Sequence, residues 1–260
     1  MTAISHLKPK FQKIKHLLLP WLDVLAIIAW GMVILKHWLS GKLNLLIHPN
    51  YFALVIAGGM GLLLIGGFKA WELLQRRRRL TTPTGGHITI FTPGFSSSLL
   101  LITAIWGFFM TPQVFASDKA IQRGLTDISG ITRAHPQVFR SQTRPEERSL
   151  LDWVRTLNVY PEPDKYTGQK AKIQGFVVHP QDLSTEYIFL ARFVITCCAA
   201  DAYPVGLPIK LKENRDSYPP DTWLEIEGQM FTDNLGGKRK LTVAASSVKK
   251  IPQPANPYDY

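Results

Sequence analysis

Cysteine is nearly absent from this chain of 260 residues, in which Cys197 and Cys198 are the only two. So few cysteines exclude a disulfide-rich scaffold and a zinc module held by four thiolates. Acidic residues are scarce in one part, since residues 1–116 contain only Asp23 and Glu72 against eleven lysines and arginines. The other residues contain nineteen basic and seventeen acidic side chains. The net charge of +11 therefore belongs mainly to the first part of the chain.

Sequence patterns typical of catalysis are also missing. The chain has no recognisable serine–histidine–acid set, no pair of catalytic carboxylates and no phosphate-binding loop, and Gly85-Gly86 is too short for a nucleotide motif. We therefore expect a protein that is not an enzyme. The small charge excess of residues 117–260 is scattered along the sequence, and we expect no nucleic-acid partner.

Long apolar stretches occupy the first part of the chain, at about 17–39, 51–70 and 95–116. Each is close to the roughly 20 residues that a helix needs to cross about 30 Å of hydrocarbon. Three such stretches in succession are not typical of buried helices in a soluble protein. The sequence therefore predicts a transmembrane domain with three N-terminal helices at residues 1–116.

The basic residues that flank these stretches predict their orientation. Four lysines precede the first stretch, and Lys69 with the run Arg76–Arg79 lies between the second and the third. The connection between the first and the second offers only Lys36 and Lys42. Because basic flanks stay on the cytoplasmic side, we expect a multi-pass protein of the cell membrane with a cytoplasmic N-terminus. Three crossings make the C-terminal domain extracytoplasmic.

Two features of the apolar stretches exceed what anchoring in lipid requires. Asp23 lies inside the first stretch, where a carboxylate is costly unless it is paired or hydrated. It is a proton or ion relay, a contact to another helix, or a residue near the headgroups. Ala53, Ala57 and Gly61 recur at intervals of four, and such small residues let another helix approach closely. We expect them to pack against a helix of this chain or of a partner.

The remaining residues divide into a polar tether at 117–142 and an α + β domain at 143–260. A cut after Ala116 is the alternative to permanent anchoring, because the third stretch ends in small or permissive residues, Val114-Phe115-Ala116. Thr143 and Glu146 have the spacing of a capping box and predict that a helix begins there.

Beyond this helix, the pattern of β-branched and aromatic residues predicts five strands, at 172–178, 187–196, 208–212, 222–231 and 240–245. Gly175 and Gly228 are the expected bulge or bend sites. Five short strands in about ninety residues favour a small five-stranded OB-like β-barrel. A short sandwich shares this pattern.

Both cysteines fall in one cluster with an acidic residue, since Asp201 follows Cys197 and Cys198 closely. Thiolates and a carboxylate can hold zinc or another divalent metal, with His179, another residue or water in the fourth position. A redox pair and a small buried apolar pair beside a turn-capping aspartate are the other two interpretations, and all three stay open. Arg192, inside the preceding apolar strand, is expected to pair with a carboxylate such as Asp201 or Glu225.

The same cluster carries a resemblance to a known family. The chain contains Ala191-Arg192-Phe193, then Ile195-Thr-Cys-Cys-Ala-Ala-Asp-Ala202, and Gly206 after them. These residues resemble the signature of YcgQ-like bacterial proteins, which are described as two-component permease subunits. The similarity also includes 175–177 and 223–228 and covers about 145–250. His179 has no counterpart in the family pattern. The resemblance implies a membrane protein beside a separate polytopic permease, and a link to metal homeostasis, with zinc as the metal.

These observations lead to one preferred function and one alternative. We expect an accessory subunit of a membrane permease, whose outer domain binds or gates a solute such as a metal ion through Cys197, Cys198 and Asp201. The alternative is a membrane-anchored extracytoplasmic protein for thiol redox or metal transfer, or a protein-binding scaffold.

Overall fold

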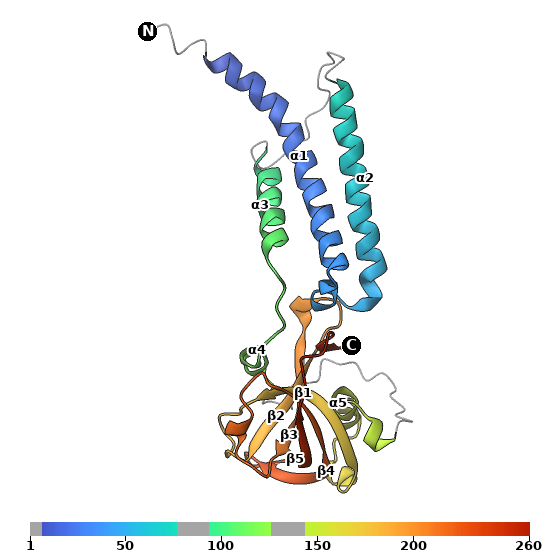
Figure 1. Cartoon of the computed structure of the whole chain (residues 1–260), viewed down its shortest axis with the longest axis vertical. Helices are drawn as coiled ribbons and strands as arrows, with labels where there is room; N and C mark the ends of the chain where they lie inside the picture. Colours follow the sequence, from blue (N-terminus) through green and yellow to red (C-terminus); the bar gives the residue numbers. More distant parts are fainter. Residues whose placement is uncertain (1–6, 77–93, 126–143) are drawn as a thin grey trace. The chain divides into compact units, whose positions relative to one another are not determined.

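The chain forms two compact units, residues 1–112 and 113–260, in the computed structural model (Figure 1). The structure describes residues 7–76, 94–125 and 144–260. The first unit is helical and the second is built around a β-sheet. Each unit is described by itself.

The first unit contains two long apolar helices. Helix α1 covers Leu7–Leu39 and helix α2 covers Phe52–Arg76, and two short 3-10 turns lie between them. By length and composition, the segments Leu18–Leu39 and Pro49–Gln75 could each cross a membrane. The first unit is therefore compatible with membrane association.

The prediction of three transmembrane helices was wrong, because the third helix is too short. Helix α3 covers Phe95–Phe109, and its 15 residues give a length of about 22 Å at 1.5 Å per residue. Gly94 adopts a left-handed conformation with φ 87° just before the helix. Met110 is already extended at the other end, and Pro112 disfavours helical geometry at the residue before it. The apolar stretch therefore continues to residue 116, beyond the end of the helix at Phe109.

Glycines bring α1 and α2 close together. A Cβ atom added to Gly66 would lie 2.5 Å from Ile28, and one added to Gly59 would lie 2.9 Å from Ile34. Gly31 on α1 faces Leu63 in the same way, at 2.8 Å. Such close approach is the usual basis of helix association in lipid.

Helix α3 lies against α1 and runs in the same direction. The Ser97 hydroxyl donates a hydrogen bond to Asp23 near the start of α3, and Lys36 donates to the carbonyl of Phe108 near its end. Between them, Trp30 Nε1 donates to the carbonyl of Leu100 at 3.0 Å. The C-terminal end of α3 is therefore level with the C-terminal end of α1.

The second unit contains a six-stranded mixed sheet in the order β1-β4-β5-β3-β2-β6, in which β1 also pairs with β2. The strands cover Lys170–Val178 (β1), Tyr187–Val194 (β2), Tyr203–Lys210 (β3), Trp223–Leu235 (β4), Lys238–Lys250 (β5) and Tyr258–Asp259 (β6). Most neighbours are antiparallel, but β3 pairs with β5 and β2 pairs with β6 in parallel.

This sheet corrects the predicted five-stranded OB-like barrel. Five of the strands overlap the predicted segments, but β6 at Tyr258–Asp259 was missed because two residues carry no alternating pattern. Strand β3 begins at Tyr203, five residues earlier than expected, and includes Pro204 and Gly206. The result is a mixed sheet with an additional parallel strand beside β2.

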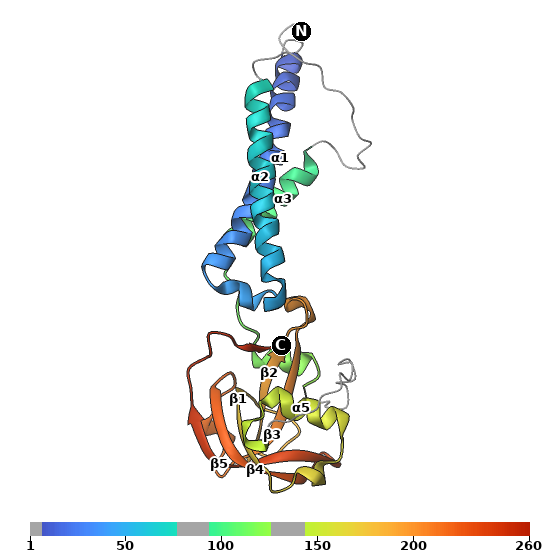
Figure 2. The same ribbon diagram turned by 90° about the vertical axis from the view of Figure 1, so that its right-hand side faces the viewer.

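Helix α5, Leu150–Val159, covers the core of this unit and packs against β3, β1 and β2 (Figure 2). Ser149 caps it, and its side chain accepts a hydrogen bond from the backbone N–H of Asp152 at 3.1 Å. The predicted cap, Thr143, lies outside the described residues. Trp153 has no exposed surface and anchors the helix in the apolar core.

Both expected bend sites are places of close backbone approach. The β4–β5 register shifts between Glu227 and Gly228, as a β-bulge requires. A Cβ atom at Gly228 would lie 2.2 Å from the carbonyl oxygen of Ala244, and one at Gly175 would lie 2.5 Å from that of Ala191. Only glycine fits at these two positions.

The segment after α3 belongs to the second unit. Helix α4, Ser117–Gln122, follows the first residues of this unit, and the side chains of Ala120 and Leu125 are buried. This segment was predicted as the beginning of a tether. The predicted tether residues 126–142 lie outside the described part of the chain.

Candidate functional site

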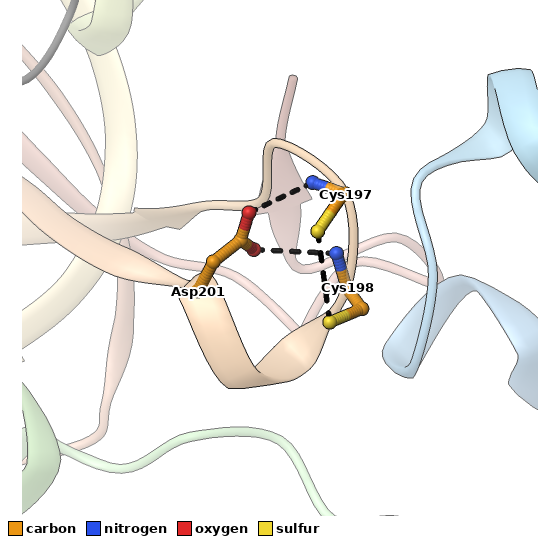
Figure 3. A group of neighbouring side chains, drawn as sticks. All are labelled: Cys197, Cys198 and Asp201. Atoms are coloured by element: carbon orange, nitrogen blue, oxygen red, sulfur yellow. Dashed lines mark hydrogen bonds between the residues drawn. The ribbon is translucent and has the colours of Figure 1, made fainter.

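The two cysteines lie in the connection between β2 and β3. Strand β2 ends at Val194 and pairs there with Tyr203, the first residue of β3. A short 3-10 turn at Ala199–Asp201 lets the connection reverse its direction. We call residues 196–202 the cysteine loop. Because strand geometry has ended before the cysteines, both side chains can point to the same region (Figure 3).

Asp201 organises this loop from within. Its carboxylate accepts hydrogen bonds from the backbone N–H of Cys197 at 2.9 Å and of Cys198 at 3.2 Å (Figure 3). It accepts a third from the Thr196 hydroxyl. Partial burial raises the pKa of Asp201, but these donors together outweigh it and hold the pKa below its usual value. Asp201 is therefore an anion that fixes the backbone of both cysteines.

The two thiols and the carboxylate form a compact group of possible metal ligands. The sulfur atoms of Cys197 and Cys198 lie 3.7 Å apart, and both are free thiols. One ligand atom from each cysteine and one from Asp201 lie within 4.8 Å of one another. Cys197 is exposed and Cys198 is partly buried, so an ion from solvent can reach them.

The carboxylate controls the protonation of the exposed thiol. The hydrogen bond to Asp201 and, after it, the neighbouring Cys198 thiol raise the pKa of Cys197 to about 11. Cys197 is therefore a neutral thiol near pH 7. A protonated thiol is a weak nucleophile, which disfavours rapid disulfide exchange. A metal ion could still displace the proton, since thiol ligands bind as thiolates.

The other residues singled out near this cluster lie elsewhere. Arg192 forms an ion pair with Asp259 at 3.2 Å, and Asp259, near the C-terminal end of the chain, replaces both carboxylates that were expected as its partner. His179 Nε2 lies 2.8 Å from the carbonyl oxygen of Tyr218 and is not part of the ligand group.

The candidate residues of the apolar helices have different surroundings. Asp23 contacts Ser97 of α3, as described above, and thus links two helices. Ala53 and Ala57 are exposed, and a Cβ atom added at Gly61 would meet nothing within 4 Å. The face of α2 with these three residues is therefore not the face that packs on α1, which contains Gly59 and Gly66.

An open pocket of about 600 Å³ lies apart from the cysteine loop. Its lining includes Lys170, Lys172 and Lys212, but neither cysteine. Lys172 is already paired with Glu227 at 2.8 Å and with Glu225 at 3.5 Å. The pocket offers no group with the chemistry of the thiols, so the cysteine loop remains the candidate site.

Sequence reasoning missed two residues that shape the loop. Thr196 bonds Asp201, and Arg123 donates a hydrogen bond to the carbonyl of Ala202 at the end of the loop. A hydroxyl residue just before the cysteine pair is a signal that could have revealed Thr196. Nothing in the sequence connects Arg123 with a carbonyl 79 residues away.

Comparison with known proteins finds similarity over part of the chain. Residues 145–260 match the family described as the DUF1980 C-terminal domain. Over 129 residues, the chain is 23% identical to UPF0703 protein YcgQ of Bacillus subtilis (strain 168). This similarity covers 48% of the chain and 45% of the relative, which is less than half of each.

Proposed function

We propose that the chain is a membrane-anchored accessory subunit of a permease. The match of residues 145–260 to the DUF1980 C-terminal domain and the similarity to YcgQ support its resemblance to YcgQ-like proteins. In this role the chain binds an ion and catalyses no reaction. Its C-terminal domain captures a divalent metal ion through Cys197, Cys198 and Asp201. The proposal depends above all on the spacing of the two sulfur atoms.

That spacing fits tetrahedral coordination. Two thiolates bound to zinc at about 2.3 Å are separated by roughly 3.8 Å across a tetrahedral edge. The sulfur atoms of Cys197 and Cys198 are 3.7 Å apart, so they need little rearrangement to bind one ion. Asp201 is within reach as the third ligand. Two sulfur donors and one oxygen donor suit zinc and other ions of borderline softness.

The incomplete ligand set supports capture and release. Structural zinc sites usually have four protein ligands, whereas sites that exchange a ligand keep a position open. Within the described residues, the group contains three ligands, and Cys197 is exposed. The ion is therefore a cargo that a partner can take over by supplying the fourth ligand.

The direction of the helices supports an extracytoplasmic C-terminal domain. The basic residues lie in the first turns of α1, ahead of the apolar segment Leu18–Leu39, and at the C-terminal end of α2 and just beyond it, which favours the cytoplasmic side for both of these ends. Helix α3 is too short to be a third span by itself, but it runs parallel to α1 and ends at the level of Lys36. The segment that starts at Met110 therefore begins at the end of α1 away from the lysines at 8–15. A reporter fused after Tyr260 tests this topology. Activity of a periplasmic reporter supports it, and activity only of a cytosolic reporter contradicts it.

A separate polytopic permease is the proposed partner in the membrane. The open face with Ala53, Ala57 and Gly61 is suited to another helix, because small residues allow close approach. Replacing Gly61 by leucine should abolish co-purification with an endogenous polytopic protein, whereas Leu64→Ile, which keeps the side-chain volume at an exposed position, should not. Recovery of the unchanged chain only as a monomer would contradict the partner proposal.

Metal analysis of the full chain tests the site. Purified chain exposed to Zn²⁺ should hold about one ion per molecule after removal of free metal, and Cys198→Ser should lose it. Serine is similar in size, and the substitution leaves the backbone N–H that bonds Asp201 in place. Ala199→Ser is the matched control, since it adds a hydroxyl to the same loop and keeps both thiols. Equal zinc in all three proteins would rule out the cysteine site.

A further inference from the structure

The cysteine loop is fixed at its beginning by the end of the chain. The backbone N–H of Ile195 donates a hydrogen bond to the carbonyl of Asp259 at 3.1 Å. Asp259 belongs to β6, which pairs in parallel with Phe193 and Val194 at the end of β2. The residues that enter the loop are thus held by a strand from about 60 residues further along the sequence.

The loop is fixed at its other end by the segment that follows α3. Arg123, directly after α4, donates a hydrogen bond to the carbonyl of Ala202, the residue next to Asp201. The Arg123 guanidinium also lies over the ring of Phe115, 4.8 Å from its centre. A cation that stacks on an aromatic ring and bonds a carbonyl has its position fixed from two sides.

Phe115 joins these two anchors. Its backbone N–H donates to the Tyr258 hydroxyl at 3.3 Å, and the two rings are 5.9 Å apart. Its ring also lies 5.1 Å from that of Phe193, which is buried in β2. Residues 115–123, β6 and the cysteine loop therefore form one continuous set of contacts inside the second unit.

We propose that Arg123 is a positioning residue of the metal site and that residues 115–123 are part of that site. The inference rests on the proposed metal binding at Cys197, Cys198 and Asp201. It extends the site beyond the DUF1980 C-terminal domain, whose match begins at residue 145. By holding Ala202, Arg123 orders the loop before an ion arrives, so less conformational entropy is lost on binding.

Metal binding at the cysteine loop and the contact of residues 115–123 with that loop must then strengthen each other. If Arg123 strengthens metal binding, a bound ion must by the same factor strengthen the contact of residues 115–123 with the loop. Residues 110–114 connect this segment to α3, so an ion bound at the loop stabilises the part of the chain that directly follows the helical unit.

Co²⁺ is a suitable probe, because thiolate ligands give it a characteristic charge-transfer absorption. The full chain in detergent should show this absorption with one equivalent of Co²⁺. Arg123→Ala should bind Co²⁺ about tenfold more weakly, yet give the same spectrum at saturation, since its ligands are intact. Arg123→Lys should recover part of the affinity. Lys119→Ala is the matched control, because Lys119 lies in α4 four residues before Arg123 and its amine bonds only Gln122 among the described residues.

Hydrogen–deuterium exchange provides a second readout on the unchanged chain. Co²⁺ should slow exchange in residues 115–123 as well as in the cysteine loop. Unchanged affinity of Arg123→Ala, or protection confined to the loop, would overturn the role of Arg123. If Arg123→Ala fails to fold, the hydrogen–deuterium exchange of the unchanged chain decides whether residues 115–123 are part of the site. If the unchanged chain shows no thiolate absorption with Co²⁺, the proposed metal site itself is wrong.

Discussion

Large apolar side chains face outward in the first unit and inward in the second. Leu64 on α2 is 76% exposed and Trp106 on α3 is 67% exposed, whereas Trp153 and Phe193 of the second unit have no exposed surface. Both units are rich in apolar residues, but only the second one encloses them in a core. The difference indicates that the first unit is suited to an apolar solvent and the second to water.

The two units also depend on different contacts for their stability. In the first, glycines such as Gly59 and Gly66 let helices approach each other, and few side chains are enclosed. In the second, burial around Trp153 and backbone pairing between strands dominate. The same kind of substitution should therefore change the free energy of unfolding by different amounts in the two units.

The largest effect is expected for a tryptophan in the core. Trp153→Ala should destabilise the second unit by about 3–5 kcal/mol, because it leaves a cavity where a buried aromatic side chain was. Trp106→Ala is the matched change in the first unit and should leave the stability of the second unchanged. Urea unfolding of the full chain in detergent, followed by hydrogen exchange of the strands, measures both. Similar losses in the two variants would refute the contrast between the units.

A smaller effect is expected where two helices meet. Gly66→Val should cost about 1–3 kcal/mol, because the new side chain would collide with Ile28 and force α1 and α2 apart. Gly61→Val on the open face of the same helix is the control and should cost much less. Thermal unfolding monitored by helical circular dichroism compares them. If Gly61→Val is the more damaging variant in isolated protein, the helix packing described here is incorrect.

The sequence predicted those parts of the fold that depend on local patterns. Two long apolar runs correctly indicated α1 and α2, and alternating residues indicated five of the six strands. The closeness of Cys197, Cys198 and Asp201 also follows from sequence distance, because a turn of three residues brings them together. Local spacing was sufficient in these cases.

Contacts between distant residues could not be predicted in the same way. The pairing of Arg192 with Asp259, the addition of β6 to β2, and the bond from Arg123 to Ala202 each join residues more than 60 positions apart. Composition also predicted too long a third helix, because apolar residues continue beyond Phe109, where α3 ends shortly before Pro112. The errors therefore concern tertiary pairing and helix ends.

The thiol pKa predicts how metal binding depends on pH. Cys197 has a pKa of about 11 and must lose its proton to bind an ion. Each displaced proton should weaken apparent Zn²⁺ affinity about tenfold per unit of pH decrease, so the loss from pH 8 to pH 7 is at least tenfold. Competition with a chromophoric chelator at several pH values measures this slope. An affinity that does not change with pH would mean that Cys197 is not a ligand. The proposed metal site of the second unit would then be wrong, and the description of the first unit would be unaffected.

The last prediction compares two aspartates, Asp201 in the cysteine loop of the second unit and Asp23 in α1 of the first. Asp201→Asn removes the main cause of the raised pKa of Cys197, which should fall from about 11 toward the ordinary value of 9.0. The thiolate fraction at pH 8 then rises about 100-fold, and because a less basic thiolate is a weaker nucleophile, alkylation should accelerate only about tenfold. Asp23→Asn should leave the rate unchanged. Iodoacetamide labelling of Cys197, quantified by peptide mass spectrometry, measures both variants, and equal rates would mean that Asp201 does not control this thiol.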